Sequence, residues 1–200
     1  MIQRQQAYRR SDPDERRQAL VEACVRTLAR LGAHGVSVRT ICAEAGVSPG
    51  LLRYYFAGID ALIAEAYRMT GDRVAKALDA AVLAVPTDKA DDRLLAYLTA
   101  SFAPPITNPE LLSTWLAFWG LTRTDPHIAA LHATIYADYR QRLEDLLTPC
   151  LPKGNDARLA SIGLTALVDG LWLEMSLGDP PFTPDEASAI VKAAVKTACE

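Results

Sequence analysis

Residues 37–56, which read SVRTICAEAGVSPGLLRYYF, are the stretch that decides the fold. Ile41 and Ala45 lie four residues apart, as on the inner face of a short helix, and Ala45 is small enough to let a second helix cross closely. Gly46 can adopt the backbone of a sharp turn, and Ser48, followed by a proline, is a typical start for the next helix. The stretch therefore predicts two short helices that meet at a steep angle, as in a helix-turn-helix.

The side chains of the second short helix divide into an anchored face and a free face. Leu52 and Phe56 lie four residues apart and are expected to fix this helix to the core, which leaves its N-terminal residues outside. In a helix-turn-helix such residues enter the major groove of DNA, where Arg53 could donate to guanine O6 and N7 and Leu51 could contact a thymine methyl group. The predicted DNA-contacting residues are Ser37, Arg39 and Tyr55 on phosphate, with Ser48, Pro49, Gly50, Leu51, Arg53 and Tyr54 along the recognition helix.

The same run, together with Leu62, resembles the N-terminal signature of the TetR family of transcriptional regulators over residues 16–65. The resemblance implies a homodimeric repressor that binds operator DNA and is released when a small molecule binds its helical body. Two positions depart from the family pattern. Ile59 stands where the family usually has a lysine, so one phosphate contact is expected to be missing. Arg53 replaces a common tyrosine, which makes it a candidate for the specificity of this particular chain.

Composition and helix-start signals extend the prediction to the whole chain. Half of the residues are apolar and 22% are charged, and β-branched residues form no alternating runs. This favours an all-α fold of about nine helices. We expect a three-helix DNA-binding head over residues 1–58, in which 1–11 form a flexible basic tail, and a ligand-binding and dimerisation bundle over 59–200. The predicted helices span about 13–31, 38–45, 49–55, 59–85, 89–102, 109–121, 126–147, 156–177 and 184–199, with proline or N-cap residues at most starts.

The net charge of −3 hides a difference between the two parts. Residues 1–60 contain nine arginines and six acidic residues, whereas residues 61–200 contain twelve basic and eighteen acidic residues. DNA responds to the local field rather than to the net charge, so a basic head on an acidic body is compatible with a DNA-binding protein.

The body contains the candidate ligand-binding residues. Aromatic side chains between helices can form a cage for a quaternary ammonium ion, helped by a carboxylate such as Asp169, which lies in an apolar helix where an unpaired charge would be costly. Aromatic residues at helical spacing also occur simply as core, and Asp169 could instead be capped or paired, so both interpretations stay open. The candidate residues are Trp115, Phe118, Trp119, Tyr136, Tyr139, Asp169 and Trp172.

A second, looser resemblance covers residues 110–178. The runs WLAFW at 115–119 and DGLWL at 169–173 resemble the body of BetI-type repressors, which control choline-to-betaine genes. It implies a small-molecule inducer, with a choline-like cation as the first candidate, and no other cofactor. The family resemblance also implies a four-helix dimer interface made by the last two helices of each copy. Its predicted residues are Leu159, Ile162, Gly163, Ala166, Leu167, Leu173, Ile190, Val191, Ala194, Val195 and Ala198.

Other classes of protein find less support. The three histidines show no metal-ligand spacing, and no G-x-S-x-G or phosphate-binding glycine loop is present, so we expect neither catalytic nor metal-binding residues. A helical adaptor that binds protein, or less plausibly an enzyme, is the alternative function. The four cysteines are widely spaced, and we expect no signal peptide and no membrane span, hence a cytoplasmic protein.

Overall fold

The computed structural model describes residues 13–200, and the predicted tail at 1–11 lies outside the described residues. These residues form nine α-helices and two short 3-10 helices, and the predicted all-α fold is confirmed. The elements are α1 (Pro13–Leu31), η1 (Ala33–Gly35), α2 (Val38–Ala45), α3 (Pro49–Tyr55), α4 (Ile59–Leu83), α5 (Ala90–Thr99), η2 (Ala100–Phe102), α6 (Pro109–Leu121), α7 (Pro126–Leu147), α8 (Ala157–Ser176) and α9 (Pro184–Cys199).

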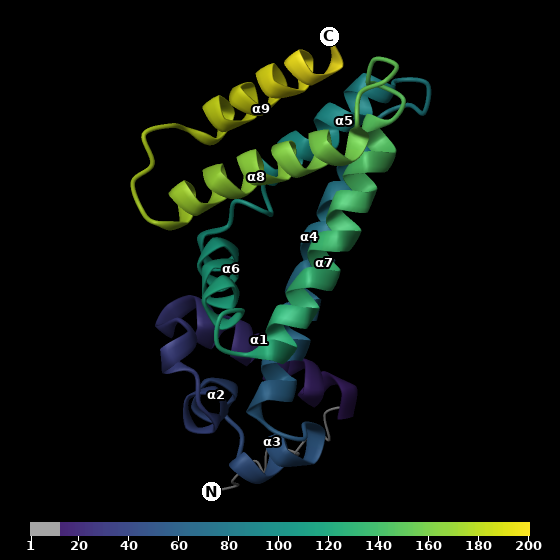
Figure 1. The fold of residues 1–200 in the computed structure, drawn as a ribbon. Helices are drawn as coiled ribbons and strands as arrows, with labels where there is room; N and C mark the ends of the chain where they lie inside the picture. The colour runs from purple at the N-terminus through teal and green to yellow at the C-terminus, as the bar shows by residue number, and fades with distance from the viewer. Residues whose placement is uncertain (1–12) are drawn as a thin grey trace, which may run out of the picture.

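Figure 1 shows an elongated molecule with α2 and α3 at one end and α8 and α9 at the other. The long helices α4 and α7 run between the two ends and pack against each other, and α6 descends beside them to pack on α1. The helical body is therefore joined to the N-terminal helices by two packed connections, α4 and α6, rather than by a linker.

Side-chain caps account for most of the helix starts. The side chains of Asn108, Asp125 and Asp156 each accept backbone hydrogen bonds at the starts of α6, α7 and α8. At the start of α9 Thr183 and Glu186 form a capping box: Thr183 Oγ1 accepts from the Glu186 nitrogen at 3.2 Å, and Glu186 Oε2 accepts from the Thr183 nitrogen at 2.7 Å.

Two boundaries differ from the sequence prediction. Helix α4 ends at Leu83, two residues early, and the predicted helix at 89–102 divides into α5 and the 3-10 turn η2. The Trp172 indole nitrogen donates to the Ser101 carbonyl at 2.9 Å, so α8 binds a carbonyl group of this turn. Local sequence could not reveal that long-range contact.

The N-terminal helices share one apolar core. Leu20, Leu28, Ile41 and Leu52 are fully buried where α1, α2 and α3 meet. Two ion pairs connect α1 and α2 at the surface of this core: Glu44 on α2 accepts from Arg26 at 2.8 Å and from Arg30 at 3.1 Å, both on α1. Because these are exposed pairs, they orient α2 more than they stabilise it.

Arg17 connects α1, α3 and α4. Its guanidinium group donates to Glu65 of α4 at 2.8 Å and lies over the ring of Phe56, the C-cap of α3, at 5.0 Å from the ring centre. The end of α3 is thereby held by a side chain that α4 itself positions.

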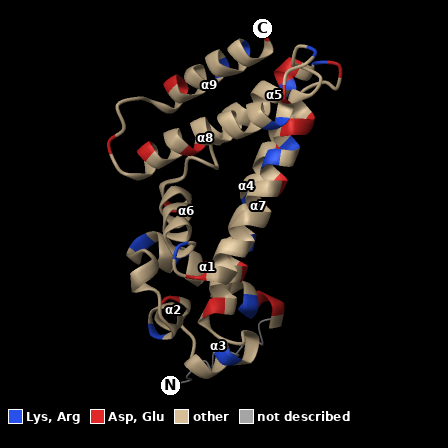
Figure 2. Ribbon diagram, viewed as in Figure 1, with Lys and Arg blue, Asp and Glu red and all other residues tan. Residues whose placement is uncertain are grey.

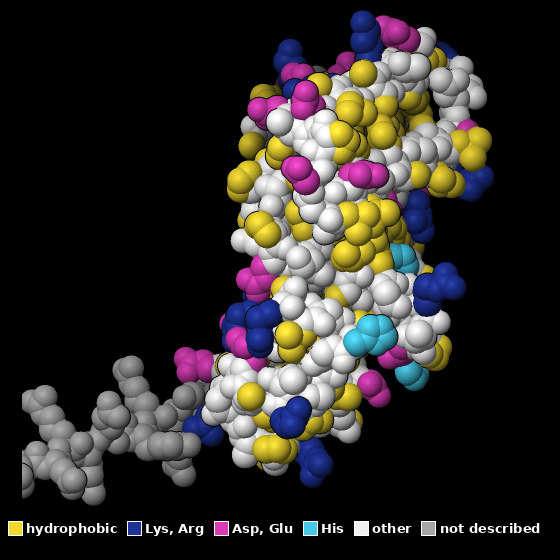
Figure 3. Space-filling model, turned by 90° about the vertical axis from the view of Figure 1, so that its left-hand side faces the viewer, with side chains coloured by type: hydrophobic (Ala, Val, Ile, Leu, Met, Phe, Trp, Pro, Cys, Tyr) yellow, Lys and Arg dark blue, Asp and Glu magenta, His cyan; other side chains and the backbone are white. Residues whose placement is uncertain are grey.

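The α8–α9 end of the molecule exposes apolar side chains. Leu159 is 58% and Leu177 67% exposed, and Figure 3 shows hydrophobic side chains gathered over the upper half of the molecule, the end at which α8 and α9 lie in Figure 1. Two residues predicted to belong to this surface do not: Val191 and Val195 are buried, because α9 packs against α5 and α8 within the same chain.

Candidate DNA-binding surface and effector cavity

The turn between α2 and α3 has the geometry that the sequence predicts. Gly46 takes the left-handed conformation with φ 64° and ψ 33°, and the Val47 nitrogen donates to the Cys42 carbonyl at 3.0 Å. Ser48 Oγ then caps α3 by accepting from the Leu51 nitrogen at 3.4 Å. A side chain at Gly46 would have open space but a strained backbone, which explains why glycine suits this position.

The predicted DNA-contacting residues lie on the free faces of α2 and α3. Arg39, Pro49, Gly50 and Arg53 are exposed, and Tyr54 is 78% exposed. In Figure 2 the ribbon of both helices carries positions of positively charged residues at this end of the molecule. A surface of exposed positive and aromatic side chains on two short helices fits the phosphates and base edges of a DNA groove.

The remaining residues predicted to contact DNA are partly buried or hydrogen-bonded within the protein. Ser37 caps α2 by accepting from the Thr40 nitrogen at 3.1 Å, and Thr40 Oγ1 accepts from the Ser37 nitrogen at 2.8 Å. Leu51 and Tyr55 are partly buried, with the ring of Tyr55 edge-on to Tyr54 at 5.0 Å. Ile59, where the family usually has a lysine, packs against the core.

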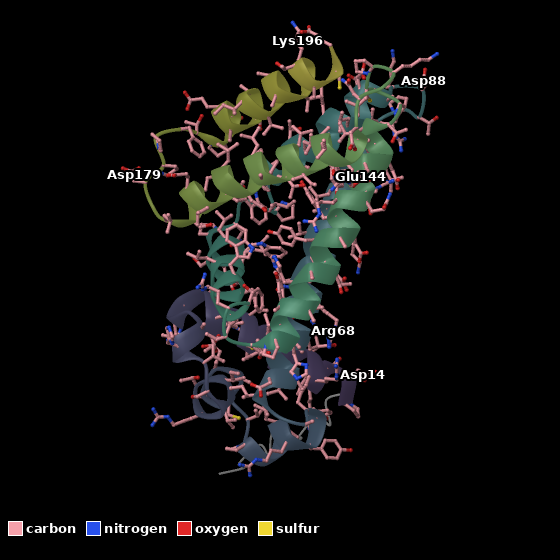
Figure 4. The ribbon with its side chains drawn as sticks, in the orientation of Figure 1. Asp14, Arg68, Asp88, Glu144, Asp179 and Lys196 are labelled. Carbon is pink, nitrogen blue, oxygen red and sulfur yellow. The ribbon has the colours of Figure 1, made fainter. Side chains whose placement is uncertain are left out.

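The body contains a cavity of about 260 Å³. It lies between α4, α5, η2, α6, α7 and α8, and Figure 4 shows the side chains that fill the space between these ribbons. Its aromatic walls are Tyr97, Trp115, Tyr136, Tyr139 and Trp172, and its carboxylates are Asp72, Asp79, Asp138 and Asp169. A cavity of this kind, apolar with a few polar groups, is typical of a small-molecule site between helices.

A hydrogen-bond network centred on Tyr136 organises one wall. The Tyr136 hydroxyl accepts from the indole nitrogens of Trp115 at 3.4 Å and Trp119 at 3.1 Å, and donates to Asp169 Oδ1 at 3.1 Å. The hydroxyl therefore has its donor and both acceptor sites in use. The His132 ring packs on Tyr136 with ring centres 4.2 Å apart and the ring planes tilted by 34°. Its Nδ1 lies 2.7 Å from the Tyr67 hydroxyl of α4.

Asp169 is the most perturbed acid of the cavity. Burial raises its pKa to about 6, although the Tyr136 hydroxyl and the charge of Arg140 both act to lower it. Within the described residues it forms no ion pair within 4 Å. The carboxylate is thus ionised at neutral pH but poorly compensated by the protein.

Five of the seven predicted ligand-binding residues line this cavity: Trp115, Tyr136, Tyr139, Asp169 and Trp172. Trp119 instead stands behind Tyr136, beside a shallower depression on the other side of the Tyr136–Asp169 contact. Phe118 lines neither space, because it is fully buried and stacked on Tyr67 with ring centres 4.2 Å apart. It belongs to the core, the alternative that the sequence left open for these aromatics.

Sequence reasoning missed the contributions of α4 and α5. Tyr97 and Ser101 lie four residues apart on the segment that faces Trp172, and Asp79 of α4 pairs with Arg142 of α7 at 2.9 Å across the cavity wall. The spacing of Tyr97 and Ser101, one polar residue per helical turn, could have indicated that both face the same polar space. The partner of Arg142 is 63 residues away in the chain and leaves no local signal.

Two elements therefore define the class of the protein: a helix-turn-helix with a free basic face, and a helical body with a cavity. The model for bacterial regulatory proteins of the tetR family matches residues 20–66, and that for the C-terminal domain of BetI-type transcriptional repressors matches residues 90–200. The chain belongs to the TetR family of transcriptional regulators and has a BetI-type C-terminal domain.

Individual relatives agree. The regulator BetI of Pectobacterium carotovorum subsp. carotovorum (strain PC1) is 33% identical over 178 residues, which is 88% of this chain and 89% of the relative. The crystal structure of a transcriptional regulator from Pseudomonas aeruginosa PAO1 is 41% identical, with a TM-score of 0.84 over 94% of this chain and 92% of that one. A regulator from Saccharomonospora viridis, solved in complex with choline, shares the fold at 22% identity, with a TM-score of 0.80 over 92% of this chain and 96% of that one. The protein is thus a transcriptional repressor of this family, and the enzyme and adaptor alternatives are set aside.

Replacing Arg53 is expected to change operator specificity. In Arg53→Ala, removal of a bidentate donor to guanine would weaken operator binding by about 1–3 kcal/mol and relax discrimination at one base pair. Arg39→Ala is the matched control, because Arg39 is predicted to contact phosphate, and its loss is expected to weaken binding to all sequences alike and to lower the salt slope by about one. Fluorescence anisotropy with the operator and its single-base variants at several salt concentrations measures both. Unchanged discrimination by the Arg53 variant would remove Arg53 from the specificity-determining set.

Proposed function

We propose that this repressor responds to a small organic cation of the choline class, which binds in the body cavity and releases the protein from operator DNA. The observation that carries the proposal is Asp169, an under-compensated carboxylate on the wall of an aromatic cavity. A quaternary ammonium ion cannot donate hydrogen bonds from its nitrogen, and is bound by aromatic faces and negative charge. Trp115, Tyr136 and Trp172 offer such faces beside Asp169.

The charge around the cavity favours a cation over an anion. Four aspartates contribute to the wall and only one basic residue, Arg142, which is paired with Asp79. Asp72 and Asp138 are exposed where α4 and α7 border the cavity, so the approach is also negative. Such an arrangement concentrates cations near the entrance. The regulator from Saccharomonospora viridis, which has this fold, binds a ligand of the proposed class.

Release from DNA requires that the cavity and the DNA-binding head be coupled. Gly71, Val74 and Leu78 of α4 line the cavity, while the N-terminal half of the same helix contacts α1 and holds Arg17 through Glu65. A ligand that favours one position of α4 therefore changes the position of α3. Coupling of this kind is typically about 1–3 kcal/mol, and DNA must weaken ligand binding by the same factor.

We propose further that the exposed apolar surface of α8 and α9 forms the homodimer interface. Leu159, Ile162, Leu173 and Ile190 are exposed there, and Gly163, also exposed, would permit close approach of a second copy. A twofold axis through this surface would place the two recognition helices one DNA turn apart, about 34–36 Å, on a palindromic operator.

Dimerisation also explains why α8 is apolar on two sides. This helix is long and apolar enough to cross a membrane, by length and composition alone. Only 33% of its most apolar stretch is buried inside the chain, so its own chain covers little of this apolar surface. One side packs on α6 and α7, and the exposed side is the one we assign to the partner. We accordingly place the protein in the cytoplasm, bound to operator DNA rather than to a membrane.

Titration with choline tests the proposed function directly. Choline is expected to bind the purified repressor in isothermal titration calorimetry, to change the fluorescence of Trp115 and Trp172, and to release a DNA fragment from upstream of the gene in a gel-shift assay. Dimethylbutanol, the uncharged carbon analogue of choline, serves as the control and should do none of these. No heat and no release with choline, betaine aldehyde and other small quaternary ammonium ions would overturn the choice of effector class.

A further inference from the structure

We propose that the Tyr139 hydroxyl is the specificity-determining group that binds an oxygen atom of the effector, so that the effector must combine a cationic centre with a hydroxyl or carbonyl group. This inference rests on the proposed cation site and adds a second requirement to it. It concerns the end of the ligand that Asp169 does not bind.

The Tyr139 hydroxyl is the one buried side-chain polar atom in residues 13–200 that has no hydrogen-bond partner. The Ser101 hydroxyl lies close to it without completing a bond of good geometry. Buried hydroxyl groups are almost always hydrogen-bonded, because leaving one unpaired costs the free energy of its lost hydration. Tyr139 is one of the residues that line the cavity, so a bound molecule that reaches this buried hydroxyl would supply its missing partner.

The hydroxyl groups of the other two tyrosines that line the cavity, Tyr97 and Tyr136, are already in use. Tyr136 accepts two hydrogen bonds and donates one, and Tyr97 donates to the Tyr139 carbonyl at 3.5 Å. Burial raises the pKa of Tyr139 well above its usual value, so its hydroxyl stays protonated and offers a donor at every physiological pH. Tyr139 is thus the tyrosine of this wall whose donor is available to a ligand.

The placement of the two groups fits a short bifunctional cation. Tyr136 and Tyr139 lie three residues apart on α7, so they share one helical face. The Tyr136 hydroxyl donates to the Asp169 carboxylate, and Tyr139 lies next to Ser101. The position of Ser101 is fixed by Trp172, whose indole nitrogen donates to the Ser101 carbonyl at 2.9 Å. An ammonium group beside Asp169 would leave the rest of a small ligand directed toward Tyr139 and Ser101.

A thermodynamic cycle with two ligands and two proteins tests this inference. The ligands are choline and ethyltrimethylammonium, which has the same shape without the hydroxyl oxygen, and the proteins are the full-length wild type and Tyr139→Phe. The wild type is expected to bind choline about tenfold more tightly than ethyltrimethylammonium, the effect of one satisfied hydrogen bond in a buried site. In Tyr139→Phe this preference should fall to less than about twofold, with ethyltrimethylammonium affinity nearly unchanged.

Tyr67→Phe is the matched control, because it removes the hydroxyl of a buried tyrosine that does not line the cavity and whose hydroxyl lies 2.7 Å from His132 Nδ1. It should keep the tenfold preference for choline. Tyr139→Phe removes only an unpaired atom, so its thermal midpoint should equal or exceed that of the wild type, which shows that it is folded.

The outcomes separate this inference from the proposed function. If the wild type binds both cations equally, or if Tyr139→Phe keeps the preference for choline, the role of Tyr139 is overturned while the cation site stands. If neither cation binds the wild type, the cation site itself fails and the inference falls with it. Calorimetry reports all three results on the same samples.

Discussion

Asp169→Asn is expected to produce a more stable repressor that has lost its response to the cationic effector. The carboxylate forms its single hydrogen bond with Tyr136, and burial raises its pKa from 3.8 to about 6, so the ionised form destabilises the folded protein at neutral pH. Removing that charge should raise the free energy of unfolding at pH 7 by about 1–3 kcal/mol. The same change removes the main counter-charge of the ligand, and choline affinity should fall by about 100-fold.

The pH dependence has a definite sign. A folded-state pKa above the unfolded value means that the folded protein binds more protons between about pH 4 and pH 6. The destabilisation by Asp169 is therefore absent below about pH 4 and complete above about pH 6. Urea unfolding of wild type and variant should differ at pH 7 and converge at pH 4. In the wild type, choline affinity should fall by up to about tenfold per pH unit below pH 6.

Asp138→Asn is the matched control, because Asp138 is an exposed carboxylate at the same cavity. It should change neither stability nor the pH profile and should reduce choline affinity only slightly. An Asp169→Asn variant that still binds choline with wild-type affinity would mean that another group compensates the charge of the ligand.

Ile162→Arg is expected to convert the repressor into a monomer that no longer holds its operator. Ile162 is 42% exposed in the first half of α8, and a guanidinium group there would be buried against the second copy in the proposed twofold dimer. Each half-site would then have to bind alone, and the lost avidity should weaken operator binding by about 10²–10⁴-fold. Analytical ultracentrifugation and anisotropy on the same samples connect the two effects.

Leu83→Arg provides the comparison, since Leu83 is an exposed leucine at the C-terminal end of α4 rather than on α8 or α9. That variant should remain dimeric and bind the operator normally. A dimeric Ile162→Arg protein with full operator affinity would rule out α8 as the interface.

Much of this architecture could be predicted from local sequence. Gly46, Ser48 and the Leu52–Phe56 pair determine the helix-turn-helix because turn, cap and anchor are all properties of neighbouring residues. Thr183 and Glu186 likewise define the start of α9. Such signals need no knowledge of the tertiary structure, and the helices they predict agree with the structure to within a few residues.

The cavity was less predictable because its walls come from distant parts of the chain. Phe118 and Trp115 lie on one helical face in the sequence pattern, and both rings contact Tyr67, but only Trp115 also lines the cavity. The inward side of α9 shows the same limit: Val191 and Val195 look like interface residues until α5 is placed against them. Periodicity identifies an apolar face but not what covers it.

The length of α4 has a mechanical consequence. With 25 residues it is a rod of about 37 Å, clasped near its N-terminal end by the Glu65–Arg17–Phe56 contact and bordered by the cavity farther along. A rod of that length works as a lever: a tilt of about 3° pivoting at one tip displaces the opposite tip by about 2 Å. In a dimer, such a shift of α3 changes the distance between the two recognition helices. A small tilt of α4 is therefore enough to prevent both helices from entering successive major grooves at once.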